Sequence, residues 1–312
     1  MTNLNDSDEI IYNDEINILE LILVLWKRKF LIIFLVILSG LASIQYALSL
    51  PNFYRSSALL TSASGGGGQS ALSRFGGMAS LAGISLPAQK TDKTIEGIER
   101  IKSFEFFNDF FLPNILLQDL MAVKTWNPQS NEIFYIDEIY NADNNKWIRS
   151  VSFPRTSKPS SQEAYKEYKK MMNISQDSKT SFISISVKHQ SPFIAEMWVN
   201  VIVDEINQSM RNREKEKVIK SINFLNTQLE VMNYDEIKQS ISSLQQEQIK
   251  SLMMIESSEE YIFKTLSSPV APELKYEPKR SRIVIFGTVL GGIISVILVL
   301  ALHYLLLFRN RL

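Results

Sequence analysis

The sequence predicts an α+β domain with a long helical hairpin, anchored by two transmembrane helices. Long apolar segments at 30–48 and 283–308 enclose a polar middle, in which a β-rich part precedes a long helical part. Neither apolar segment contains Asp, Glu, Lys or Arg. At about 1.5 Å per helical residue, each can cross the roughly 30 Å hydrocarbon core of a bilayer. The alternative, a buried helix of a soluble protein, would normally show a polar stripe.

Charges around the first apolar segment predict a cytoplasmic amino terminus. Lys27, Arg28 and Lys29 precede it, whereas only Arg55 lies close on its far side. A cleaved signal peptide is the alternative, but this apolar run is longer than a signal core and begins late, after an acidic tail. A second crossing returns the carboxyl terminus to the cytoplasm. The basic residues just before the second segment oppose this orientation; they are Lys275, Lys279, Arg280 and Arg282. A long loop is, however, translocated largely regardless of its charge.

Composition favours an extracytoplasmic protein that binds no nucleic acid. Lys and Arg together number 33, as do Asp and Glu, so no excess of positive charge indicates a nucleic-acid partner. The predicted cytoplasmic tails are too short to fold, which leaves the working part outside the cytoplasm. The chain has no cysteine, so packing or assembly must hold that part together. A bacterial inner-membrane protein facing the periplasm fits these observations.

The β-rich part begins with a strand that leaves the membrane at 52–62 (NFYRSSALLTS). A glycine-rich loop follows at 64–89, and it carries apolar side chains at near-helical spacing. Two interpretations stay open, a mobile surface loop and an inter-subunit or membrane-proximal contact. The candidate contact residues are Leu72, Phe75, Met78, Leu81 and Ile84.

The remainder of this part mixes helices and strands. Residues 94–111 show helical spacing, with Pro113 ending the helix. Residues 131–150 hold β-forming aromatics around a polar turn, and a loop with Pro154 and Pro159 follows. A short helix at 161–172 and a strand at 180–188 complete an α+β domain.

From Ser191 the pattern is helical almost to Leu266. Pro192 suits the first turn of a helix, and apolar residues trace one face beyond it. Asn233 and Tyr234 interrupt the pattern, and Asp235 can cap a second helix. Since the chain must return to the membrane, we expect an antiparallel hairpin. Neither half buries its apolar stripe alone, which predicts a partner surface.

Prolines stiffen the approach to the second membrane segment, where we expect an extended strut with Pro269, Pro272 and Pro278. Glycines within that segment form a small-residue face on which another helix can pack closely: Gly287, Gly291 and Gly292. The predicted organisation is a cytoplasmic tail at 1–29, a transmembrane helix at 30–49, a periplasmic α/β base domain at 50–190, a helical hairpin at 191–268, a proline-rich strut at 269–282, a second transmembrane helix at 283–308 and a cytoplasmic tail at 309–312.

The sequence offers little for catalysis. Without cysteine, and with His189 and His303 as its two histidines, the chain lacks the usual zinc ligands and the usual nucleophile relays. We expect His189 to be solvated or capping, and His303 to pack with Tyr304 near the membrane interface. We therefore predict a protein that is no enzyme, with no catalytic, cofactor-binding or metal site and no cofactor.

Several strings, in order and spacing, resemble the polysaccharide co-polymerases, the Wzz-type chain length determinant proteins. They include DEINILELILVLWKRK from Asp14, LPNFYRSSALL, GGMASLAGISL and SPFIAEMWVNVIVDEIN. The most telling is the closing stretch from Glu260 to Gly292, EYIFKTLSSPVAPELKYEPKRSRIVIFGTVLGG. The resemblance covers nearly the whole chain.

This resemblance implies a membrane-proximal α/β domain, a hairpin projecting into the periplasm, and a homo-oligomeric ring. The implied partners are the lipid bilayer, a membrane-embedded polysaccharide polymerase and the growing lipid-linked glycan, whose modal length the ring sets without making bonds. The sequence shows no cytoplasmic kinase extension, which favours the type that acts on lipopolysaccharide O-antigen. Alternatives are an adaptor for capsule or exopolysaccharide export, a two-helix periplasmic sensor and a membrane enzyme of glycan synthesis.

Overall fold

The computed structural model describes residues 18–63, 93–231 and 234–309. Its contacts divide the chain into two compact units. The terminal unit is formed from residues 1–50 and 277–312, and the central unit from residues 51–276. The predicted fold class is confirmed, since the chain combines long helices, a sheet and two long apolar helices.

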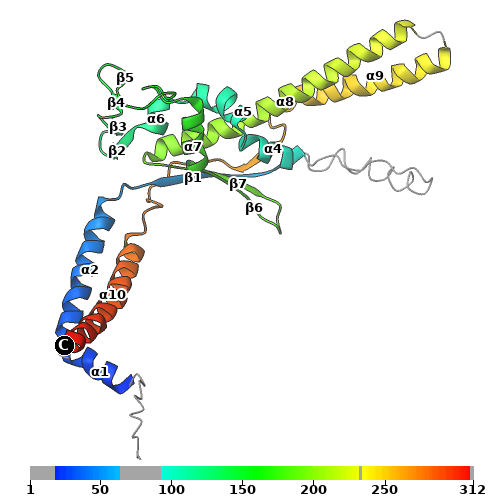
Figure 1. Ribbon diagram of the computed structural model, residues 1–312. Coiled ribbons are helices and arrows are strands. Elements are labelled where there is room, and N and C mark those ends of the chain that lie inside the picture. The colour runs from blue at the N-terminus through cyan, green and yellow to red at the C-terminus, as the bar shows by residue number, and fades with distance from the viewer. Residues whose placement is uncertain (1–17, 64–92, 232–233, 310–312) are drawn as a thin grey trace, which may run out of the picture. The chain divides into compact units, whose positions relative to one another are not determined.

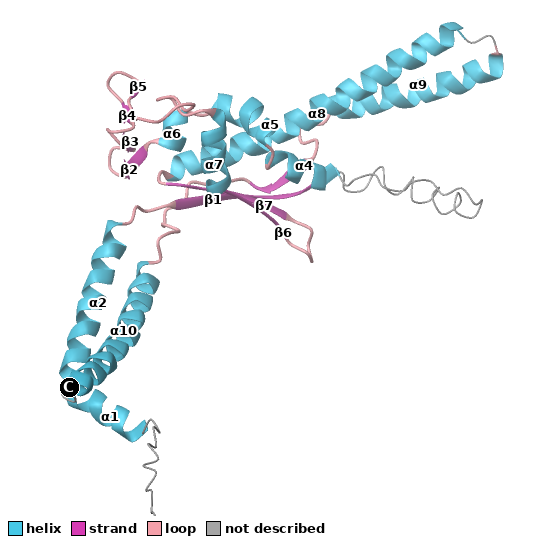
Figure 2. Cartoon of the chain, in the orientation of Figure 1, coloured by secondary structure: helices cyan, strands magenta, loops and turns pink. Residues whose placement is uncertain are grey.

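The terminal unit consists of helices, shown in Figures 1 and 2. They are α1 (Ile18–Lys27), α2 (Lys29–Ser49) and α10 (Arg280–Arg309). By length and composition α2 and the described part of α10, Arg280–Leu305, could each cross a membrane, with mean hydropathies of 2.3 and 2.8. Helix α2 contains the predicted apolar segment 30–48, and α10 contains the segment 283–308. They run antiparallel, because Ser43 lies against Gly287 and Ser39 against Gly291.

The central unit is built on a four-stranded antiparallel sheet in the order β6-β7-β1-β8. Its strands are β1 (Tyr54–Ser62), β6 (Met172–Gln176), β7 (Ile183–His189) and β8 (Phe263–Ser267). In β1, Ser56, Ala58 and Leu60 are buried and alternate with exposed residues, so one face of the strand meets the core. Figure 2 shows the helices of this unit gathered over one side of the sheet.

Aromatic side chains dominate the core between sheet and helices. Phe111 lies 4.8 Å from Tyr168 and 5.7 Å from Trp198, between ring centroids, and all three side chains are buried. Such packing contributes apolar burial and favourable ring geometry together. These rings come from the segment after α4 (Lys93–Ile101), from α7 (Ser161–Met171) and from α8 (Pro192–Val231).

The single helix predicted over 94–111 is wrong, since the segment is broken after Ile101. Ser103 starts a new turn, because its hydroxyl accepts a hydrogen bond of 3.1 Å from the amide of Phe106. The short α5 (Phe104–Phe106), a π-helical turn at Phe107–Phe111 and a 3-10 turn at Leu112–Asn114 follow. The break turns the aromatic side chains into the core.

Two small sheets and a short helix complete the central unit. They are α6 (Leu117–Met121), β2 (Val123–Asn127) paired with β3 (Glu132–Tyr135), and β4 (Tyr140–Asn141) paired with β5 (Lys146–Trp147). The predicted polar turn lies between β4 and β5, and Asn145 adopts a φ of 50° there. Strands β2 and β6 were not predicted.

The predicted antiparallel helix pair is present as α8 and α9 (Asp235–Glu256). Lys215 pairs with Glu256 at 2.6 Å, and Gln245 donates to Asn226, also at 2.6 Å. Figure 1 shows this hairpin extending beyond the sheet of the central unit. The prediction of helix almost to Leu266 is wrong, because α9 ends at Glu256 and β8 begins at Phe263. Tyr234, rather than Asp235, occupies the cap position of α9.

Candidate functional site

A seam of small residues joins α2 to α10. A Cβ built on Gly287 would lie 1.9 Å from Ser43 Oγ, and one built on Gly291 would lie 2.1 Å from Ser39 Oγ. Both distances are far below van der Waals contact, so only glycine fits at these two positions. Small residues of this kind let membrane helices approach closely, and dispersion contacts and hydrogen bonds then hold the pair together.

Hydrogen bonds accompany the close approach. Ser39 Oγ donates to the carbonyl of Gly287 at 2.9 Å, and so links the two helices. Gly292 is less constrained, because its added Cβ would meet Val36 Cγ2 at an ordinary 3.8 Å. The structure thus places Gly287 and Gly291 against α2 of the same chain. This face is therefore not free to receive a helix of another copy.

The proline-rich strut lies against the start of β1 as far as Tyr276. Ser56 Oγ donates to the carbonyl of Val270 at 2.8 Å, and the amide of Tyr276 donates to the carbonyl of Phe53 at 2.8 Å. The guanidinium of Arg55 lies 4.0 Å from the centre of the Tyr276 ring. Pro269 and Pro272 belong to this segment, whereas Pro278 belongs to the terminal unit.

A buried polar network fixes the end of β7 and corrects the expectation of a solvated His189, whose side chain is fully buried. Its Nδ1 accepts from the amide of Ser191 at 2.9 Å, so Nε2 carries the proton and donates to the carbonyl of Asp119 at 2.9 Å. Burial lowers the pKa of His189 to about 4. Tyr135 Oη donates to Asp119 Oδ1 at 2.6 Å, while burial raises the pKa of the Asp119 carboxyl.

Asn207 joins α8 to β8, a role that no local pattern indicates. Its Oδ1 accepts from the amides of Ile262 and Phe263 at 2.9 and 3.0 Å, and its Nδ2 donates to the carbonyl of Phe263 at 3.0 Å. The residue is buried within the apolar face of α8. A buried amide in such a position needs partners, and the edge of β8 supplies them.

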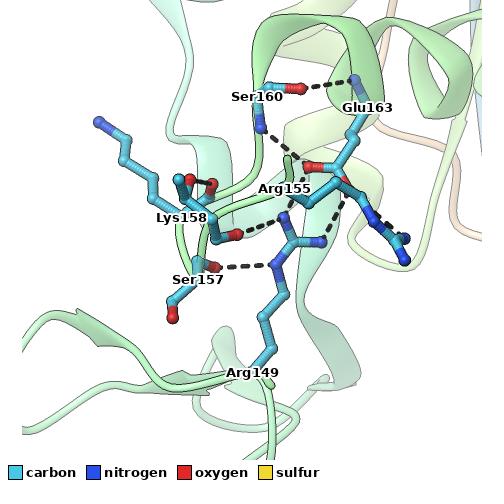
Figure 3. A network of polar contacts seen from close by, with 7 residues as sticks. Arg149, Arg155, Ser157, Lys158, Ser160 and Glu163 are labelled. Atoms are coloured by element: carbon cyan, nitrogen blue, oxygen red, sulfur yellow. Dashed lines mark hydrogen bonds and ion pairs between the residues drawn. The ribbon is translucent and has the colours of Figure 1, made fainter. Parts of the chain in front are cut away.

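An arginine clamp organises the loop between β5 and α7 (Figure 3). Arg149 donates to both carboxylate oxygens of Glu163, at 3.1 and 2.6 Å. It also donates to the carbonyls of Thr156 and Ser157, at 3.0 and 2.8 Å. Glu163 and Ser160 form a capping box at the start of α7. The hydrogen bonds from Arg149 and the Ser160 amide hold the pKa of Glu163 down, at about 2.

The clamped loop presents Phe153 to solvent. Its side chain is 95% exposed, and the exposed cations Arg155 and Lys158 follow it. The sequence predicted a proline-containing loop here but no function for it. The pairing of Arg149 with Glu163 crosses the loop and could not be inferred from local pattern.

The helical hairpin keeps large apolar side chains in solvent, in line with the expected partner surface. On α8 they are Ile219, Phe224 and Val231, and on α9 Ile237, Leu244, Ile249, Met253 and Met254. Most charged side chains of the run at 211–220 are exposed.

The remaining predicted positions can be placed only in part. Leu72, Phe75, Met78, Leu81 and Ile84 lie outside the described residues. His303 and Tyr304 are in edge contact, with ring centroids 5.9 Å apart. Within the described ranges, no group of three or more His, Cys, Asp or Glu side chains is placed to hold a metal ion.

Comparison with known proteins finds a family match and similar solved structures. Residues 14–108 match the family described as Wzz, chain length determinant protein. A solved "full-length bacterial polysaccharide co-polymerase" shares 15% identity and a TM-score of 0.39, over 94% of this chain and 99% of that one. A fragment of WzzB, a polysaccharide co-polymerase from Salmonella Typhimurium, shares 13% identity with a TM-score of 0.30. The match covers 72% of this chain and 100% of that fragment. No curated protein sequence matches the chain.

Proposed function

We propose that this chain regulates the length of a polysaccharide, the O-antigen of lipopolysaccharide, without making glycosidic bonds itself, because residues 14–108 match the Wzz family of chain length determinant proteins. The family match carries the proposal. Two long apolar helices that bracket a mixed central unit support it, because a protein of this design can hold a scaffold beside a membrane-embedded polymerase.

The proposed location is the bacterial inner membrane, with both termini in the cytoplasm and the central unit in the periplasm. The basic run Lys27–Lys29 before α2 supports this orientation, since positive charge near a first membrane helix is retained on the cytoplasmic side. The central unit at 51–276, with its sheet and with the hairpin of α8 and α9, then lies outside the cytoplasm.

The proposed mechanism is that of a homo-oligomeric scaffold for the membrane polymerase and the growing lipid-linked glycan. Apolar side chains left in solvent on the hairpin support an assembly of copies, because they would gain free energy by burial against a neighbour. A scaffold sets length by how long it keeps polymerase and glycan together. No side chain of the regulator then has to act on a reacting bond.

Deleting the gene and resolving the surface polysaccharide on a gel tests this function. A regulator leaves polymer in place and changes its distribution of lengths, and a plasmid copy restores the modal length. Complete loss of surface polymer would instead indicate an enzyme or an export adaptor. An unchanged distribution would contradict the proposal and favour a sensor.

A further inference from the structure

The exposed Phe153 lies on a loop whose shape is fixed. Single exposed apolar residues are common on protein surfaces. Phe153 differs because the bidentate Arg149–Glu163 pair and the bonds from Arg149 to the carbonyls of Thr156 and Ser157 hold the loop that carries it. Holding a side chain in place before binding lowers the entropy lost when a partner binds it. The loop is thus preorganised to present an aromatic ring.

Positive charge predominates in the sequence on both sides of Phe153. Lys146, Arg149, Arg155 and Lys158 lie between 144 and 162, and that stretch of sequence contains no Asp or Glu. Glu163, the first carboxylate after it, is engaged by Arg149 and lies 3.9 Å from Arg155. Lys146 and Lys158 are exposed. A partner for this loop should therefore combine an apolar depression with a carboxylate rim.

The central unit itself carries such a surface. An open cavity of about 360 Å³ lies between α4 and α8. Among the residues that line it Ile95 is apolar, and the carbon atoms of charged side chains supply the rest of its apolar surface. Ile95 in its wall is 51% exposed. For comparison, an enclosed apolar cavity of roughly 150 Å³ accommodates a benzene molecule. The volume is thus sufficient for one phenylalanine side chain.

Three carboxylates lie around the cavity, and three cations of the same chain balance their charge. Glu96, Glu99 and Glu105 line it together with Arg100 and Arg213. Each carboxylate has a cation nearby in its own chain: Arg213 at 3.7 Å from Glu96, Lys102 at 2.8 Å from Glu99 and Arg100 at 3.5 Å from Glu105. The side chains of Glu99 and Glu105 nevertheless remain 66% and 68% exposed, so their oxygens can still meet further cations.

The two surfaces are formed by different elements of the central unit. The loop starts from β5, and Figure 1 shows β5 and α4 on different sides of α7. A contact between two different patches is heterologous, so each copy offers one patch to the next copy and the series can close into a ring. A second copy of this chain is accordingly the partner that matches both surfaces.

We propose that Phe153 of one copy docks into the α4–α8 cavity of the next, with Arg155 and Lys158 facing Glu99 and Glu105. This contact rests on the assembly of copies proposed above and specifies which surfaces meet. It also gives the clamp a role, since Arg149 and Glu163 set the position of Phe153 without touching the neighbour.

Cysteine crosslinking of the full-length protein in its membrane tests the contact, because the native chain has no cysteine. The Phe153→Cys, Ile95→Cys double variant should form a ladder of disulfide-linked oligomers under mild oxidation. A matched pair, Phe153→Cys with Lys179→Cys on the exposed turn before β7, should give no ladder. A bond within one chain would produce no ladder either, so a ladder reports contact between copies.

Two further variants measure the energetics of assembly in detergent. Phe153→Ala should raise the protein concentration at half-assembly by about tenfold or more, as expected for an aromatic anchor. Phe182→Ala, at another exposed phenylalanine, should leave it nearly unchanged. Lys158→Glu and Glu99→Lys should each weaken assembly, and the double variant should recover part of the loss.

The outcomes separate this contact from the proposed function. Oligomers that form without a 153–95 ladder would overturn the contact and leave the scaffold proposal standing. A ladder between Ile95→Cys and Phe75→Cys in its place would assign the cavity to the glycine-rich loop and would also overturn it. A protein that stays monomeric at every concentration would refute both.

Discussion

Individual polar residues decide the local structure of the central unit, and the Arg149–Glu163 clamp shows how. A bidentate pair between guanidinium and carboxylate has fixed geometry, and Arg149 uses its remaining donors on two loop carbonyls. Glu163 also closes the capping box with Ser160. One carboxylate therefore holds the loop and starts α7.

Replacing Glu163 with Gln should lower the free energy of unfolding by about 1–2 kcal/mol, because charge-assisted hydrogen bonds are lost. The pKa of Glu163 is lowered to about 2 in the folded protein, against roughly 4.3 in an unfolded chain. Its contribution is thus present above about pH 4.3 and is lost as the pH falls towards 2. Thermal unfolding of wild type and E163Q should converge over that window. Glu167→Gln, at a partly exposed carboxylate that pairs with Lys170, serves as control, and a constant difference at every pH would contradict this role.

Asn207 makes a similar contribution at the join between α8 and β8. Asn207→Ala leaves two buried amides and one carbonyl without their side-chain partner, which should cost roughly 2–4 kcal/mol. Asn212→Ala, at an exposed position on the same helix, should change stability by less than about 0.5 kcal/mol. Equal melting temperatures for the two variants in detergent would show that β8 does not depend on Asn207.

At the scale of elements, the seam between α2 and α10 depends on glycine at two positions and tolerates change at a third. A side chain at Gly291 would overlap Ser39, whereas one at Gly292 would meet Val36 at normal contact distance. The two positions are adjacent in sequence, which provides a matched comparison within a single turn.

Gly291→Leu should separate the two helices, and Gly292→Leu should not. The separation can be followed with cysteines at Gly40 and Thr288, since a Cβ at Gly40 would lie 3.4 Å from Thr288 Oγ1. We expect the 40–288 disulfide to form readily in the native background and with Gly292→Leu, and to lose most of its yield with Gly291→Leu. Equal yields in all three would contradict the seam as described.

The elements also show how far the sequence predicts the fold. The apolar runs at 30–48 and 283–308 lie within Lys29–Ser49 and Arg280–Arg309, because hydropathy and helix length are local properties. Strand β8 was missed because its pattern also suits a helix, and its anchor, Asn207, lies 55 residues from Ile262. The clamp and the α4–α8 cavity were missed for the same reason, since both depend on contacts across the tertiary structure.

At the scale of the whole molecule, regulation from the periplasm requires a defined orientation in the membrane. Reporter domains that are active only outside the cytoplasm should work when inserted at Ser160 and fail when fused to either terminus. The basic run before α2 and the two crossings are the reasons. Activity of a reporter at the carboxyl terminus would exclude this orientation.

The proposed scaffold role excludes a catalytic one. An alanine scan of the central unit, scored by the modal length of the surface polysaccharide, distinguishes the two. Scaffold contacts are each worth on the order of 1 kcal/mol, so substitutions at the loop tip, the strut and the exposed hairpin residues should shift the length gradually. An active site would instead lose orders of magnitude with one group. A single substitution that eliminates all polymer, while the protein stays folded and assembled, would contradict the account.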